Sequence, residues 1–161
     1  MTNREFCLDR RQRERKAFVN VLKAVPQGTL DYRPHPISRT AVELAWLIAF
    51  ADSALVPLIE KGAVEWKEVP APAKIGEIVA AYERNAKAVD DLIARTSDKA
   101  WEQKARFFFG TPRPWEDTVQ NFVWGFLHDA IHHRGQLTTY LRPMGSKVPS
   151  IYGPSADDPG M

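Results

Sequence analysis

The sequence predicts an all-α protein, a four-helix bundle followed by an extended C-terminal tail rich in proline and glycine. Four long segments, residues 3–25, 40–62, 73–95 and 114–141, have apolar residues at helical spacing. The prolines are concentrated in the connections between these segments, and no stretch alternates apolar and polar residues clearly enough to indicate strands. This pattern is typical of helices that pack on helices around a single core.

Length and composition indicate one domain over residues 1–161. A chain of 161 residues with 44% hydrophobic and 26% charged residues can bury a full core. A net charge of +2 gives no general attraction to nucleic acid, and the first twenty residues lack the apolar stretch of a signal peptide. The single cysteine, Cys7, suits a reducing compartment. We therefore expect a soluble, cytoplasmic protein that contacts neither nucleic acid nor membrane.

The second segment has the clearest boundaries. Thr40-Ala-Val-Glu43 is a capping-box pattern, so we expect a helix to start there. We expect Pro57 to kink or end this helix, and Gly62 is a suitable stop. Because the segment is apolar almost all round, it is predicted to be central or to face a partner, which favours a homodimer.

The connections in the second half are less regular. Residues 63–72 are predicted to be a linker. Phe107-Phe-Phe109, in the connection 97–113, can either cover a ligand pocket or pack across one end of the bundle. The last helix is expected to begin near Pro114, with Glu116 and Asp117 at its N-terminus.

The last segment also carries the residues most suited to chemistry. Three of the four histidines, His128, His132 and His133, lie within six consecutive residues. On a helix, residues four apart share a face, which pairs His128 with His132 and Asp129 with His133. Either pair can present two metal-binding atoms to one point. Asp129 and His133 continue the apolar row of the helix, so we expect them to face the core. There Asp129 would need a metal ion or a charged His133 as partner, and the spacing leaves a metal site and a simple ion pair equally open.

A family resemblance follows from this motif. His132-His-Arg-Gly-Gln-Leu137, followed by Tyr140-Leu-Arg142, resembles the signature of the DinB-like superfamily of four-helix metalloproteins. Residues 143–157 and 32–40 are similar to the tail and to the second-helix entry of one branch of it. The resemblance implies a divalent metal, such as zinc or nickel, held by a histidine on the second helix and by two residues four apart on the last. The two last-helix positions carry over to Asp129 and His133. A carboxylate at the first of them resembles the mycothiol-dependent maleylpyruvate isomerases.

The second-helix ligand is missing from this pattern. The family pattern Glu-Leu-Ala-x-His-Ile corresponds to residues 43–48, where Leu47 stands at the position expected to be histidine. Two protein ligands seldom hold zinc or nickel tightly, so we expect a weak metal site or none. His128 or His132 could replace the ligand only by turning inward, and His35 only if its loop folds over the end of the bundle.

Two functions therefore stay open. The resemblance implies a metal-assisted transferase or isomerase that uses a small-molecule thiol, with Arg134 and Gln136 supporting the metal ligands. A salt bridge of Arg134 to a helix end and a buried hydrogen bond for Gln136 are the simpler roles. The alternative is a metal-free, non-catalytic dimeric bundle that binds a small molecule or has a structural role. Leu47 favours this alternative, whereas the presence of Asp129 and His133 favours the enzyme.

Overall fold

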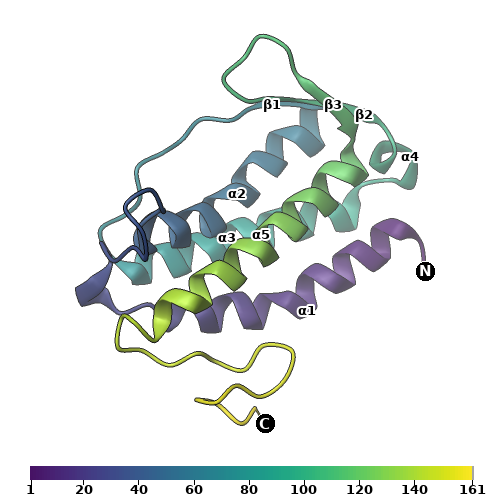
Figure 1. The fold of residues 1–161 in the computed structure, drawn as a ribbon. Coiled ribbons are helices and arrows are strands. Elements are labelled where there is room, and N and C mark those ends of the chain that lie inside the picture. Colours follow the sequence, from purple (N-terminus) through teal and green to yellow (C-terminus); the bar gives the residue numbers. More distant parts are fainter. Residues whose placement is uncertain (161) are drawn as a thin grey trace.

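The computed structural model describes residues 1–160 and is mostly helical (Figure 1). Four helices of 21–23 residues dominate it: α1 (Asn3–Lys23), α2 (Ala41–Lys61), α3 (Ile75–Arg95) and α5 (Val119–Leu141). Helix α2 packs against α3 and α5, and α1 packs against the same two helices. The other elements of the described chain are the 3-10 turn η1 (Gln27–Thr29), the short helix α4 (Asp98–Trp101) and the strands β1 (Ala63–Glu65), β2 (Lys104–Phe108) and β3 (Trp115–Thr118).

Helix α2 begins and ends largely as its sequence indicates. The Thr40 hydroxyl accepts a hydrogen bond from the Glu43 amide, and the Glu43 carboxylate accepts one from the Thr40 amide, which completes the capping box. The helix continues through Pro57, so the prediction that this residue could end it is wrong. The carbonyl that loses its partner belongs to the half-buried Ser53 and can be hydrated. Gly62 follows the helix with φ of 70°, a left-handed conformation that suits glycine.

A small sheet corrects the expectation of a chain without strands. Strand β1 pairs in parallel with β2, and β2 pairs antiparallel with β3. In β2 the side chains of Ala105 and Phe107 are buried while Lys104 and Arg106 are exposed. This alternation covers too few residues to stand out in the sequence, but it is enough to fix which face of the strand is buried.

The sheet also moves the start of the last helix. Residues 115–118, including Glu116 and Asp117, belong to β3 and not to the first turn of α5. Thr118 caps α5, because its hydroxyl accepts a hydrogen bond from the Asn121 amide. The prediction that the last helix starts near Pro114 is therefore wrong, because strand β3 lies between Pro114 and α5.

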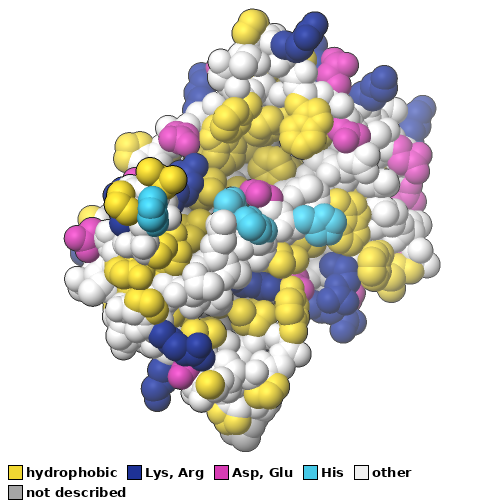
Figure 2. Space-filling view, in the orientation of Figure 1, with side chains coloured by type: hydrophobic (Ala, Val, Ile, Leu, Met, Phe, Trp, Pro, Cys, Tyr) yellow, Lys and Arg dark blue, Asp and Glu magenta, His cyan; other side chains and the backbone are white. Residues whose placement is uncertain are grey.

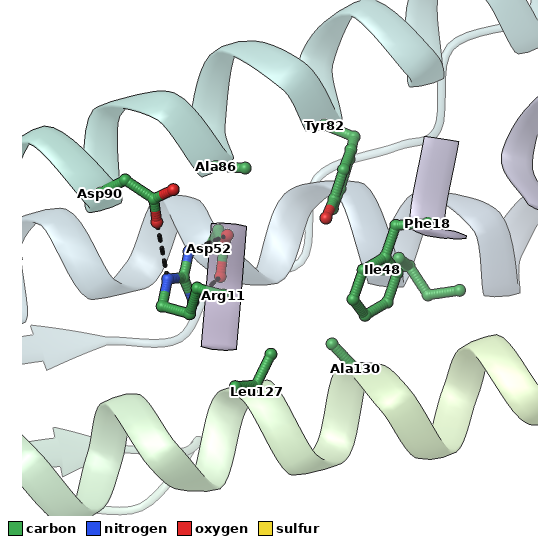
Figure 3. Close-up of a pocket in the computed structure, with 9 residues that line it drawn as sticks. All are labelled: Arg11, Phe18, Ile48, Asp52, Tyr82, Ala86, Asp90, Leu127 and Ala130. Atoms are coloured by element: carbon green, nitrogen blue, oxygen red, sulfur yellow. Dashed lines mark hydrogen bonds and ion pairs between the residues drawn. The ribbon is translucent and has the colours of Figure 1, made fainter. Parts of the chain in front are cut away.

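The core consists of two apolar clusters, one toward each end of the four long helices. A charged cluster lies among the helices (Figure 3), where Arg11 of α1 contacts Asp52 of α2 and Asp90 of α3. These three residues are each no more than 9% exposed. Each charge is paired, as buried charges must be, so the cluster ties α1, α2 and α3 together.

The tail after α5 has no helix or strand in its described part, residues 142–160. It folds back on itself, because the carboxylates of Asp157 and Asp158 accept hydrogen bonds from the amides of Val148 and Ser150. Val148 and Ile151 pack against the core. The tail is attached to the helices by these apolar contacts and by hydrogen bonds of the Tyr152 hydroxyl with Arg134 and Glu14.

By length and composition, α2 is the one helix of the described residues that could cross a membrane, and half of the relevant window is buried inside the protein. Leu44, Ile48 and Leu55 are in the core. Leu47 and Phe50, on another side, line surface hollows. Packing on one side and cavity walls on another account for its nearly all-round apolar character.

Candidate functional site

An open cavity of about 760 Å³ lies between α2, α5 and the β2–β3 hairpin. Six aromatic side chains line it: Trp66, Phe107, Phe109, Trp115, Phe122 and Phe126. We call it the aromatic cavity. In Figure 2 a hydrophobic patch lies in the corresponding region, with histidine and acidic side chains beside it. Cavities with apolar walls and a few polar groups are the usual form of small-molecule sites.

Connections as well as helices build this wall. Trp66 follows β1, Phe107 lies in β2, Phe109 in the hairpin loop and Trp115 in β3. The rings contact one another and those of α5, with centroids 5.7 Å apart for Phe107 and Phe126. The three consecutive phenylalanines were predicted either to cover a pocket or to pack across one end of the bundle. Phe107 and Phe109 line the aromatic cavity, whereas Phe108 lines a hollow on the other side of the hairpin.

Asp129 and His133 meet at the α5 wall of the cavity. The Nε2 atom of His133 lies 3.3 Å from Oδ2 of Asp129. The Nδ1 atom of the same ring lies 2.8 Å from Oε1 of Gln136. Both ring nitrogens therefore face acceptor oxygens, an arrangement that a doubly protonated imidazole satisfies with two donated hydrogen bonds.

The electrostatics of the pair follow from this contact. The hydrogen bond to Asp129 raises the pKa of His133, and that to Gln136 adds to the rise, against the effect of partial burial. The hydrogen bond from His133 lowers the pKa of Asp129. Each partner thus favours the charged form of the other, and the pair is an ion pair over the pH range between the two shifted values.

The expectation that Asp129 and His133 face the core needs correction. The Asp129 side chain is 60% exposed and that of His133 is 19% exposed. The apolar row of α5 that these two residues continue faces the core only as far as Phe126. Beyond this residue the row borders the aromatic cavity and not a neighbouring helix. Asp129 is consequently hydrated on one side and does not incur the full cost of a buried carboxylate.

The other histidines do not join this pair at the cavity. His128 is exposed and its ring lies 5.7 Å from that of Trp124. The exposed His132 has its ring 5.3 Å from that of His133, but it is not among the residues that line the cavity. His35 lies in an exposed turn, where Nδ1 is 3.4 Å from the Ile37 amide. None of the three replaces a ligand at position 47 in this structure of residues 1–160.

Arg134 lies on the opposite side of α5 from the pair. Its guanidinium is buried, with NH1 2.7 Å from the Glu14 carboxylate of α1 and NH2 2.7 Å from the Tyr152 hydroxyl of the tail. It also lies 4.5 Å from the centroid of the Phe18 ring. Arg134 thus forms a salt bridge with the side chain of Glu14 and not, as predicted, with a helix end. The hydrogen bond of Gln136 to His133 is exposed, so the prediction of a buried one is wrong.

Three charged residues at the cavity were not singled out by the sequence, Arg39, Glu68 and Arg113, and the first two lie close together. Arg39, just before α2, has its guanidinium 3.9 Å from the Glu68 carboxylate of the linker. Both line the aromatic cavity together with Leu47 and His133. No motif marks them, because they meet only when the linker folds against the start of α2.

Comparisons with known proteins agree with this fold. The model of the DinB family matches residues 1–160. This chain belongs to the DinB family. A DinB-like protein from Bacillus cereus is 24% identical, with a TM-score of 0.74, and the match covers 92% of this chain and 97% of the other. For a DinB-like protein from Bacillus subtilis the identity is 14%, the TM-score 0.70 and the coverage 90% and 96%.

A more distant solved structure is the mycothiol-dependent maleylpyruvate isomerase. Its identity is 14% and its TM-score 0.57, and the match covers 92% of this chain but 63% of that one. These similarities establish the DinB fold. No curated protein matches the sequence.

The residues at the cavity do not fit the divalent metal that membership of the DinB family suggested. Leu47, Asp129 and His133 do line one cavity, so the three expected positions converge. However, leucine offers no ligand atom, and both nitrogens of His133 already face oxygen acceptors. Within residues 1–160 no group of three histidine, cysteine or acidic side chains is placed to hold a metal ion. Catalytic zinc sites use three protein ligands, and this site offers two that are paired with each other.

Proposed function

We propose that this DinB-family protein binds a small organic molecule with an apolar, ring-containing body in the aromatic cavity. The observation that carries the proposal is the exposure of its wall, where Phe109 is 64% and Trp115 65% exposed. Aromatic surface in contact with water is unfavourable by about 25 cal/mol per Å², so a ligand that covers these rings gains stability from their desolvation.

The polar groups at one end of the cavity orient such a ligand. Asp129 Oδ1 has no hydrogen-bond partner among residues 1–160, while Oδ2 faces His133. A hydroxyl or amine on the ligand can donate to this free oxygen. Below the raised pKa of His133, the charged imidazole balances Asp129, and Arg39 lies near Glu68, so these four groups carry no net charge. We therefore favour a neutral ligand with a hydrogen-bond donor.

A pair of glycine substitutions in α5 tests this proposal. Gly125 lines the cavity, and an added Cβ there meets nothing within 4 Å. Gly125→Leu places a side chain in the cavity without a clash in the helix. Gly135→Leu is the matched control, because Gly135 is exposed on the same helix, is equally unobstructed and lies outside the cavity.

The measurement is titration with the fluorescent probe N-phenyl-1-naphthylamine, which is neutral, has two aromatic groups and carries one N–H donor. We expect the wild-type protein and Gly135→Leu to bind one equivalent with the same Kd. Gly125→Leu should raise the Kd roughly tenfold or more, which corresponds to about 1.4 kcal/mol. Equal affinity for all three proteins would contradict a ligand site in the aromatic cavity.

A second candidate is an enzyme that uses a low-molecular-weight thiol. It is favoured by the structural similarity to the mycothiol-dependent maleylpyruvate isomerase. The metal-dependent form of this candidate would use Asp129 and His133 as ligands despite Leu47. Elemental analysis beside an Asp129→Ala/His133→Ala double variant separates the candidates: one equivalent of zinc or nickel, lost in the variant, together with thiol transfer, supports the enzyme.

The proposal extends to assembly and location. We propose a homodimer in the cytoplasm, as the apolar α2 and the composition suggested. Since one apolar side of α2 lines the cavity, a dimer interface would involve another surface. Light scattering coupled to size-exclusion chromatography distinguishes a particle of twice the 18.2 kDa chain mass from a monomer.

A further inference from the structure

The charged cluster inside the helices borders a small cavity, separate from the aromatic cavity. Arg11 Nε lies 2.8 Å from Asp90 Oδ1, and Arg11 NH2 lies 2.7 Å from Asp52 Oδ2. Arg15 also donates to Asp90. Two guanidinium groups thus balance two carboxylates, and the cluster is neutral as a whole.

Tyr82 adds a hydroxyl group to this cluster that the protein itself leaves without a partner. The residue is 6% exposed, and within residues 1–160 its hydroxyl makes no hydrogen bond. Burial raises the pKa of Tyr82, so the hydroxyl stays protonated and is a donor. In Figure 3 it points into the space between Arg11, Asp52 and Phe18.

The space at this hydroxyl has the size of one water molecule. Its volume is about 20 Å³, and its lining includes Arg11, Asp52, Tyr82 and Asp90. A cavity needs roughly 10–15 Å³ of this kind of space, and two to four polar partners, to hold a water. The lining offers both: Tyr82 and Arg11 supply donors, and the two carboxylates supply acceptors. An empty cavity would instead leave the hydroxyl of Tyr82, a residue only 6% exposed, without a hydrogen-bond partner, which is uncommon in folded proteins.

We propose that one water molecule is bound in this cavity and links the Tyr82 hydroxyl of α3 to the Arg11–Asp52 pair of α1 and α2. Water fits the site better than a cation does, because Arg11 and Arg15 already neutralise the carboxylates. The bound water gives the Tyr82 hydroxyl a partner in a polar layer that the three helices share. The site is independent of the ligand proposed for the aromatic cavity.

Water-oxygen magnetic relaxation dispersion, which counts water molecules held long enough to tumble with the protein, tests this site. We expect Tyr82→Phe to hold one such water fewer than the wild-type protein. Tyr32→Phe is the matched control, since the Tyr32 hydroxyl also makes no hydrogen bond in the described chain but lies outside this cavity. This control should retain the wild-type count, and an unchanged count in Tyr82→Phe would overturn the proposal.

A crystal structure of the wild-type protein at about 1.5 Å resolution decides the question even if Tyr82→Phe fails to fold. Electron density for a water within hydrogen-bond distance of the Tyr82 oxygen, or about 2.5–3.0 Å, supports the proposal. An empty cavity, or a Tyr82 hydroxyl that contacts Asp52 directly, overturns it.

Discussion

The imidazole of His133 lies between two oxygens of its own helix, Oδ2 of Asp129 at 3.3 Å and Oε1 of Gln136 at 2.8 Å. Asp129 lies one turn of α5 before His133, and Gln136 lies in the turn after it. Helix geometry alone brings these three residues together. The ring is consequently fixed in orientation at the cavity wall, and both of its N–H groups are engaged when it is charged.

This geometry predicts how His133 titrates. Asp129→Asn removes the charge of the strongest partner, so we expect the pKa of His133 to fall from its raised value toward or below about 6.5. Nuclear magnetic resonance titration of the His133 ring protons measures the change. Gln136→Ala should lower the pKa by less, because Gln136 contributes less than Asp129. Identical titration curves for the wild-type protein and Asp129→Asn would show that the ion pair does not form.

The same pair predicts a pH dependence of stability. His133 has a raised pKa in the folded protein, so its contribution is complete below about pH 6.5 and is lost as pH rises through the folded value. Asp129 has a lowered pKa, so its contribution is present above about pH 4 and is lost as pH falls through the folded value. Urea unfolding of the wild-type protein and of Asp129→Asn/His133→Gln should differ most between these limits. A difference that is constant from pH 3 to pH 9 would contradict this account.

Leu47 predicts the metal behaviour of the site. Leu47→His adds a third nitrogen ligand to the cavity that Asp129 and His133 already line. We expect the wild-type protein to retain no stoichiometric zinc or nickel and Leu47→His to gain about one equivalent, because three protein ligands are typical of open zinc sites. Calorimetric titration with zinc measures the affinity, and Leu47→His/His133→Ala is the control that should lose it again. Equal zinc affinity in the wild-type protein and Leu47→His would contradict the view that the residue at position 47 determines whether the site binds zinc.

The contact between Arg134 and Glu14 predicts a large stability effect away from the cavity. Arg134→Met leaves the Glu14 carboxylate, 5% exposed, without its charged partner. We expect a loss of about 3–5 kcal/mol in the free energy of unfolding, measured with urea. Tyr152→Phe removes a weaker partner and should cost about 1 kcal/mol. In Arg134→Met/Glu14→Gln the loss should be smaller than in Arg134→Met, and a larger loss would show that Glu14 is stabilised in another way.

Gly62 predicts a local backbone effect at the end of α2. With φ of 70°, it adopts a conformation that costs other residues roughly 1–2 kcal/mol. Gly62→Ala should therefore lower the free energy of unfolding by this amount. Gly28→Ala is the comparison, because Gly28 is not among the residues with positive φ and an added Cβ meets nothing within 4 Å. Its stability should be unchanged, and equal losses at both positions would argue against a conformational cause.

The sequence predicted the long helices well and the sheet poorly, for a physical reason. A helix of more than twenty residues repeats its apolar pattern over several turns, and Thr40 and Gly62 mark both ends of α2 chemically. The strands contain three to five residues each, so their alternation is too brief to recognise. Trp66 and Trp115 reach the cavity only through this sheet, and their role could not be read from the chain alone.

The candidate site was predicted in part for a similar reason. Spacing within one helix was enough to pair Asp129 with His133. The side of α5 that faces water was not predictable, because it depends on where a neighbouring helix is absent. Arg134 directly follows His133, yet it lies across the helix against Glu14. Arg39 and Glu68 come from different connections, and their proximity is a property of the folded chain.

The placement of the cavity wall has a consequence for divergence within the family. Phe109 and Trp115 are mostly exposed and lie on a hairpin that can change in length and composition while the core between the long helices stays intact. Substitutions in this hairpin would reshape the aromatic cavity at a smaller loss of folding free energy than substitutions in the core between the helices. Related proteins can therefore acquire different ligand preferences on a common helical frame, and the hairpin is the segment in which those differences should accumulate.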